Sequence, residues 1–249
     1  MSRSVAGVSV SVRRSSGPGE IGRVFPLWRR VVPVVAVFAA IVGVLGLDSA
    51  LSETGAAAKA RVRILSRIDT EDPVVFITID DGFRTPWITD WVLDQLQWPI
   101  TNFLVSGPVR SKYRWFNQLT PHVTWGTHTR SHEQLPGRSL EEQKQAICGG
   151  ADDLEQVSGR RPVWFRPPGG AYDSTTVDAV GACGMHALVT WRVRVNGSRI
   201  DTWGGPIRRG DIILLHYRAD LALSLVSLRT ELDRLGLRPA PLDEYLPYR

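Results

Sequence analysis

The residues best suited to catalysis occur in short groups, and almost every group follows an apolar, β-branched run. These groups are Asp80-Asp81-Gly82, His128 with His132, Arg166 with the turn at residues 167–170, and His216. Runs of this kind are typical of strands buried on both faces. Barrel-like α/β proteins assemble their active sites where such strands end. The positions therefore predict one site built from several loops.

The nature of the side chains indicates a metal centre. His128 and His132 are four residues apart, and on one helical turn they would share a face and bind one ion. With Asp81 they offer two nitrogens and one oxygen, a set that leaves an open position for catalysis. Zinc is the expected ion, and cobalt, manganese, nickel or iron would accept the same ligands. A plain Asp-Gly turn and a solvated pair of histidines remain alternatives.

The elements that must position these groups alternate along the chain, which predicts an α/β fold with a mainly parallel sheet. We expect barrel-like closure of this sheet rather than an open one. Strands are predicted at residues 74–79, 100–105, 123–125, 163–165, 187–191 and 212–215. Helices are predicted at residues 85–96, 139–157 (opened by a Ser139 and Glu142 capping box), 174–182 and 221–235.

The order and spacing of these groups resemble the polysaccharide deacetylases, carbohydrate esterase family four, over roughly residues 70–247. The resemblance rests on Phe76-Ile77-Thr78-Ile79-Asp80-Asp81-Gly82, His128-Thr129-Arg130-Ser131-His132, Arg166-Pro167-Pro168-Gly169-Gly170 and Leu214-Leu215-His216. It implies a distorted (β/α) barrel in a single domain. It also implies metal-dependent hydrolysis of N-acetyl groups on a cell-envelope polysaccharide, such as peptidoglycan or another N-acetylglucosamine polymer, with release of acetate.

The resemblance also implies a role for each residue. Asp80 is the expected general base and His216 the general acid, while Arg166 orients Asp80. Asp81, His128 and His132 are the expected metal ligands. Gly169 would donate its backbone N–H to the oxyanion and Leu215 would line the acetyl pocket. Tyr172 and Trp203 are candidates for stacking on sugar. His122 and His186 match none of these groups and are expected to be structural or surface residues.

One departure from the family pattern concerns the strand predicted at residues 187–191. The family usually has aspartates shortly after the tryptophan that ends this strand, and one of them supports the catalytic histidine. Here Trp191 is followed by Arg192 and Arg194, and no acid occurs before Asp201. Nearby positive charge would lower the pKa of His216 and weaken it as an acid. Asp201 is a candidate replacement. A catalytically impaired metal- and glycan-binding protein on the same fold is therefore the alternative function.

The net charge of +5 is concentrated at the N-terminus. Residues 1–30 hold six of the 30 basic residues and one of the 25 acidic ones, so the remainder is balanced. A balanced domain has no field that attracts nucleic acid. The basic segment precedes an uncharged run at residues 31–47, which predicts a cytoplasmic tail (1–30), a single membrane anchor (31–47) and a linker (48–64). The catalytic domain (65–249), expected to be monomeric, would lie outside the cytoplasm, and cleavage of the segment would release it.

Two cysteines, Cys148 and Cys183, are too few for a cysteine-rich metal site. In an exported protein they can form a disulfide, and two unpaired buried thiols are the alternative. Trp87, Trp91 and Trp98 lie on or beside the helix predicted at residues 85–96. We expect all three in the core.

Overall fold

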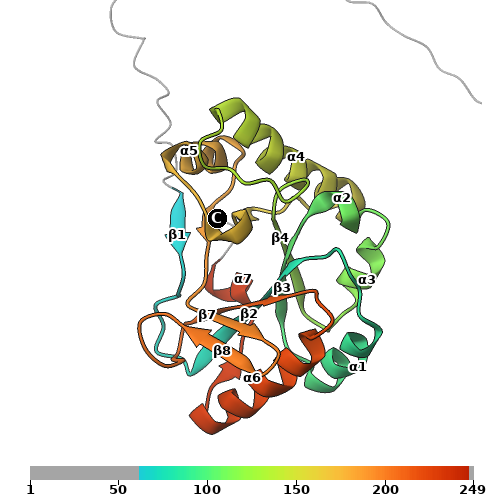
Figure 1. Ribbon diagram of the computed structural model, residues 1–249, viewed down its shortest axis with the longest axis vertical. Coiled ribbons are helices and arrows are strands. Elements are labelled where there is room, and N and C mark those ends of the chain that lie inside the picture. Colours follow the sequence, from blue (N-terminus) through green and yellow to red (C-terminus); the bar gives the residue numbers. More distant parts are fainter. Residues whose placement is uncertain (1–61, 247–249) are drawn as a thin grey trace, which may run out of the picture. The chain divides into compact units, whose positions relative to one another are not determined.

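The computed structural model describes residues 62–246. The predicted tail and membrane anchor, and most of the linker, lie outside this range. Within it, no helix is both long and apolar enough to cross a membrane. The described residues form an α/β fold, in which the long helices pack on the outside of a curved sheet (Figure 1).

The sheet has ten strands in the order β1-β6-β5-β4-β3-β2-β9-β7-β8, with β10 paired to β2 away from this path. All neighbours are parallel except β7 and β8. The strands are β1 (Arg63–Leu65), β2 (Val74–Asp81), β3 (Ile100–Leu104), β4 (Val123–Thr127), β5 (Trp164–Phe165), β6 (Ala187–Val189), β7 (Val193–Asn196), β8 (Arg199–Thr202), β9 (Ile212–His216) and β10 (Arg238–Pro239).

The expected barrel closure is incomplete. Among the described residues no ladder joins the edge strands β1 and β8. A single antiparallel bridge between Arg67 and Asp211 connects the chain after β1 to the residue before β9. The sheet is therefore curled and partly closed, because the hairpin of β7 and β8 occupies the edge where another parallel strand would be needed.

The long helices pack in pairs. Figure 1 shows α4 (Leu140–Ser158) beside α5 (Ser174–Ala182), and α1 (Trp87–Leu96) near α6 (Leu221–Leu235). The predicted capping box is present, since Glu142 N–H donates to Ser139 Oγ and the Glu142 carboxylate accepts from Ser139 N–H. The short helices are α2 (Ser106–Val109), α3 (Tyr113–Asn117), the 3₁₀ turn η1 (Pro168–Gly170) and α7 (Leu242–Tyr245).

The burial of the tryptophans differs from the prediction. Trp98 is buried, but Trp87 and Trp91 are 81% and 62% exposed. The buried face of α1 consists of Thr89, Val92 and Leu93, and residues 87 and 91 lie on another side of the helix. The two tryptophans are therefore surface residues.

Cys148 of α4 and Cys183, which follows α5, form a disulfide. The described residues contain no free cysteine. The disulfide decides between the two possibilities for these cysteines, a disulfide or two unpaired thiols. It also links α4 covalently to the end of α5.

Candidate active site and metal centre

The catalytic candidates lie at the carboxyl ends of four parallel strands. Asp80 and Asp81 end β2, His216 ends β9, and the register pairs Asp80 directly with His216. His128 follows β4 and Arg166 follows β5, whose residues Thr127 and Phe165 are paired. The common direction of the strands brings these groups to the same edge of the sheet.

Arg166 holds Asp80 through a buried ion pair. Its Nη1 donates to Asp80 Oδ1 at 2.7 Å and to Thr78 Oγ1 at 2.8 Å, and both charged side chains are at most 2% exposed. Nε and Nη2 donate to the carbonyls of Val189 and Thr190. Burial raises the pKa of Asp80, and the charge of Arg166 opposes this rise. Asp80 is thus held in one orientation near the strand end.

The ring of Phe103 supports the guanidinium of Arg166 from β3, with Cζ 4.1 Å from the ring centre. Gly126 of the neighbouring strand provides the space for this ring. A Cβ at residue 126 would lie 2.4 Å from the Phe103 ring, so any larger side chain would displace it. The glycine in β4 therefore contributes to the placement of Arg166.

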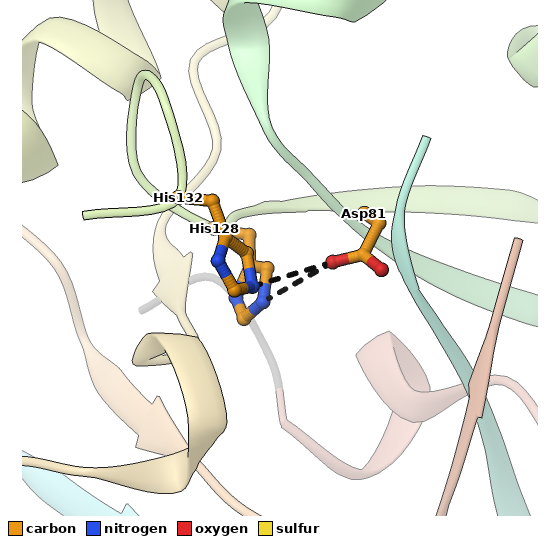
Figure 2. Close-up of side chains that lie close together, drawn as sticks. All are labelled: Asp81, His128 and His132. Carbon is orange, nitrogen blue, oxygen red and sulfur yellow. Dashed lines mark ion pairs between the residues drawn. The ribbon is translucent and has the colours of Figure 1, made fainter. Parts of the chain in front are cut away.

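Asp81, His128 and His132 converge. Their ligand atoms lie within 4.8 Å of one another. Figure 2 shows both imidazoles facing the same oxygen of Asp81, with His128 Nε2 at 3.8 Å and His132 Nε2 at 3.5 Å from Oδ1. The prediction that the histidines share one helical turn is wrong. They lie on the loop after β4, where Thr129 and His132 have φ values of 69° and 65°. This left-handed backbone returns the chain to the site after a single short loop.

These residues fit a divalent ion. His128 Nδ1 lies 2.7 Å from the carbonyl of Arg166 and must donate to it, which leaves Nε2 unprotonated and directed at Asp81. Burial lowers the pKa of His128 to about 3, so the ring is neutral, as a ligand must be. Asp81 Oδ1 is buried without a hydrogen-bond partner among the described residues. A cation between these atoms would satisfy that oxygen.

His216 faces the same site with less support. Burial lowers its pKa to about 4, Asp80 opposes this, and Arg218 and Arg166 add to the lowering. Its Nδ1 is buried and has no hydrogen-bond partner within residues 62–246. The imidazole is therefore neutral at pH 7 in the metal-free protein.

The predicted replacement of the missing acids by Asp201 does not match the structure. Asp201 accepts hydrogen bonds from Arg194 Nη2 at 2.8 Å and Arg199 Nε at 2.7 Å, and none from His216. Arg192 pairs with Asp211 at 3.0 Å. Both arginines expected beside His216 are thus bound to carboxylates, and Arg218 is the cation next to it along the chain.

The site opens into a cavity of about 300 Å³. Its lining includes Asp80, Asp81, His128, His132, Gly169 and His216, all named from the sequence. The structure adds Phe83, Trp191, Arg194, Asn196, Leu214 and Arg218. Arg194 and Asn196 come from β7, which sequence reasoning missed. Its alternation Val-Arg-Val-Asn and the following Gly197 are the available signals for such a hairpin.

The four substrate candidates are placed differently from one another. Gly169 lines the cavity, whereas Leu215 is fully buried in the hydrophobic core and Leu214 lines the cavity in its place. Side chains alternate along a strand, so Leu214 shares the face of His216 and Leu215 points to the other face. Tyr172 and Trp203 are 40% and 47% exposed and lie outside the lining. The guanidinium of Arg194 lies over the Trp203 ring at 5.5 Å.

The histidines outside the site behave as expected for structural residues. His122 Nε2 lies 2.9 Å from Asp243 Oδ1 and connects the start of β4 to α7. His186 precedes β6, and its backbone N–H donates to Val163. Neither lines the cavity.

Comparison with known proteins identifies similar chains. The family model described as polysaccharide deacetylase matches residues 67–188. An uncharacterised protein of Streptomyces coelicolor is 32% identical over 191 residues, covering 74% of this chain and 77% of its own.

Similar folds occur among solved structures. The Bc1960 peptidoglycan N-acetylglucosamine deacetylase aligns with a TM-score of 0.62 at 20% identity, over 74% of this chain and 92% of that one. A carbohydrate esterase family 4 pseudoenzyme from Bacillus anthracis aligns with a TM-score of 0.58 at 19% identity, over 74% and 68%. At these identities the likeness establishes the fold, and the same fold carries both enzymes and a pseudoenzyme.

Proposed function

Because the chain belongs to the polysaccharide deacetylase family, we propose that it is a metal-dependent hydrolase that removes N-acetyl groups from a cell-envelope polysaccharide. Peptidoglycan or another N-acetylglucosamine polymer is the proposed substrate, and acetate is released. One observation carries the proposal. The three-ligand set, Asp80 and His216 line one cavity of about 300 Å³, and the buried Arg166 pairs with Asp80 from behind that lining.

The proposed mechanism divides hydrolysis between the residues of this cavity. When bound to Asp81, His128 and His132, zinc or a similar ion would supply a Lewis acid that polarises the acetamide carbonyl. Asp80, oriented by Arg166, accepts the proton of the attacking water. The backbone N–H of Gly169 stabilises the negative charge that develops on the carbonyl oxygen. His216 must first take up a proton, and its imidazolium then protonates the leaving nitrogen, since an amide ion leaves poorly without a proton.

We place this activity outside the cytoplasm. The basic segment before residues 31–47 favours a single anchor with an external domain, and cleavage would release that domain. The disulfide between Cys148 and Cys183 supports this location, because disulfides persist in oxidising compartments. Protease digestion of intact cells, with immunodetection of the domain, tests the location. A domain that is protected until the membrane is opened contradicts it.

Acetate release from the purified 249-residue chain tests the activity. The substrates are N-acetylglucosamine oligomers and isolated cell-wall glycan, after chelation and then with zinc or cobalt added. Activity that needs the metal and is abolished in Asp80→Asn and His216→Gln supports the proposal. The control variant is His122→Gln, because this histidine lies outside the cavity.

A second candidate is a metal- and glycan-binding protein without catalysis. It is favoured by His216, whose buried Nδ1 has no partner in the described part of the chain and whose pKa is lowered to about 4. No acetate from any glycan, measured with metal demonstrably bound, would establish this candidate and reject the hydrolase.

A further inference from the structure

Three cavities follow one another away from the proposed active site. The catalytic cavity shares Phe83 with a neighbouring cavity of about 380 Å³ lined by Phe83, Arg84, Thr85, Pro86, Lys112 and Ala219. That cavity shares Thr85 and Lys112 with a third of about 560 Å³, lined by Thr85, Ser111, Lys112, Tyr113, Arg114 and Trp115. We call the second and third cavities the side groove. The side groove therefore adjoins the catalytic cavity at Phe83.

The side groove is positively charged against a balanced background. Arg84, Lys112 and Arg114 line it, and no Asp or Glu does. Residues 31–249 contain equal numbers of basic and acidic residues, so this excess is local. Arg194 and Arg218 line the adjoining catalytic cavity. Cations collected along a hollow surface attract anions to that surface.

The contacts of these cations leave charge available to a ligand. Arg84 and Arg218 form no ion pair within residues 62–246, and neither does Arg114. Lys112 Nζ donates to the carbonyl of Phe83 at 2.8 Å, which uses one of its three protons and keeps its charge. A carboxylate in the groove would thus meet cations without carboxylate partners.

The groove also offers aromatic surface. Phe83 is 48% exposed, and the rings of Tyr113 and Trp115 form part of the wall. Trp115 Nε1 donates to Asp90 Oδ2 at 3.0 Å. This hydrogen bond gives the Asp90 carboxylate of α1 a partner and holds the indole ring in place. Arg114 Nε donates to the Tyr113 hydroxyl at 3.2 Å. Fixed rings among cations suit a pyranose ring that carries negative charge.

We infer that the side groove binds a neighbouring stretch of the same glycan chain, and that this chain is anionic, with carboxylates close to its acetamido sugars. The inference rests on the proposed function and narrows it to an acidic N-acetylated polysaccharide. Such a chain would enter the catalytic cavity past Phe83. Its carboxylates would pair with Lys112, Arg114 and Arg84. A guanidinium matches a carboxylate with two parallel hydrogen bonds.

An anionic membrane surface is the competing occupant of a cationic patch. The glycan is favoured because the cations line hollows that adjoin the catalytic cavity at Phe83. A flat surface of lipid headgroups would not reach into them. A chain of sugar rings would.

The test compares two oligosaccharides of equal length with the 249-residue chain. One is the neutral N-acetylglucosamine hexamer. The other alternates N-acetylglucosamine with N-acetylmuramic acid and carries free lactyl carboxylates. We expect kcat/KM for acetate release to favour the acidic hexamer by about tenfold at low salt, and the preference to shrink as salt screens the charges. Converting the carboxylates to methyl amides should remove the preference.

The variant Lys112→Gln/Arg114→Gln should lower the acidic-to-neutral ratio roughly tenfold, mainly through KM. The control Arg229→Gln/Arg234→Gln removes the same charge from exposed positions on α6 and should keep the ratio. Equal kcat/KM on both hexamers, or a ratio unchanged in the groove variant, overturns the inference and leaves the deacetylase intact. Vesicles with anionic phospholipid provide a further arm. Vesicle binding that is weaker in the groove variant than in the control variant, with the hexamer ratio unchanged, assigns the patch to a membrane and also overturns the inference.

Calorimetric binding with Asp80→Asn separates the two proposals, because this variant retains the groove. Tighter binding of the acidic hexamer, lost when Lys112 and Arg114 are also replaced, supports the groove even where the parent chain releases no acetate. Tighter binding of the acidic hexamer without any acetate release would reject the deacetylase activity and leave the inference about the groove in place.

Discussion

The guanidinium of Arg166 donates to the carboxylate of Asp80 across 2.7 Å, and both side chains are buried. Arg166→Gln would leave this carboxylate without its charged partner. We expect a loss of about 3–5 kcal/mol in the free energy of unfolding, because an uncompensated buried charge is costly. Urea denaturation measures this loss. Arg229→Gln breaks the exposed pair with Asp233 and should cost no more than about 0.5 kcal/mol. Similar losses in the two variants would contradict the structural role of Arg166.

Leu214 and Leu215 should respond differently to truncation. Leu215→Ala creates a void in the core and is expected to cost about 2–5 kcal/mol of stability. Leu214→Ala widens the cavity beside His216. If the proposed activity is correct, the rate on N-propionyl relative to N-acetyl oligomers should rise in Leu214→Ala and stay the same in Leu215→Ala. A larger rise in Leu215→Ala would contradict this assignment, because it would indicate that the acyl group lies on the face of β9 opposite His216.

Metal binding should depend on His132. Titration calorimetry of the chelated chain with zinc is expected to give one ion per chain. His132→Ala should weaken the affinity by more than roughly tenfold, because loss of a ligand exceeds the usual effect of losing its supporting contacts. His122→Ala is the matched control, since this ring pairs with Asp243 away from the site. Unchanged affinity in His132→Ala would remove this residue from the ligand set.

The contribution of His216 to the stability of the chelated chain should fall as the solution becomes acidic. The pKa of His216 is lowered from 6.5 to about 4 by burial, so between these values the unfolded chain binds more protons than the folded one. The contribution of His216 to stability therefore falls by at most about 3 kcal/mol as pH falls from about 6.5 to 4, while the raised pKa of Asp80 acts in the opposite direction. His128 acts in the same direction as His216, with a pKa of about 3.

Urea denaturation across this pH window measures the dependence. His216→Gln should have a shallower slope than the parent chain between pH 4 and 6.5. Equal slopes would mean that His216 titrates alike in both states. Histidine NMR signals then provide the pKa directly.

The different burial of Trp98 and Trp91 should give different losses of stability when each is replaced by alanine. Trp98→Ala should cost about 3–5 kcal/mol, because the ring is buried in the main core. Trp91→Ala, at an exposed position on α1, should stay within about 0.5 kcal/mol of the parent. Thermal unfolding of the two variants side by side makes the comparison. A large loss at residue 91 would indicate that this face of α1 is covered in solution.

Much of the fold followed from local patterns. The apolar runs became β2, β3, β4, β5, β6 and β9, and the four predicted helices became α1, α4, α5 and α6. Such runs are visible because a strand covered on both faces needs apolar residues at every position. The short β7–β8 hairpin was missed. It is half-exposed, and its alternating Val193-Arg194-Val195-Asn196 lies outside the strands predicted from continuous apolar runs.

The sequence by itself determined which side chains would meet, because Asp80, Asp81, His128, Arg166 and His216 all lie at or just beyond the carboxyl ends of parallel strands. Only the tertiary structure decided how they meet. The left-handed backbone at Thr129 and His132 replaced the expected helical turn. Asp201 accepts hydrogen bonds from Arg194 and Arg199, because the antiparallel register places residues 194 and 201 opposite each other. Backbone strain and register depend on contacts between distant segments, and no local pattern in the chain contains that information.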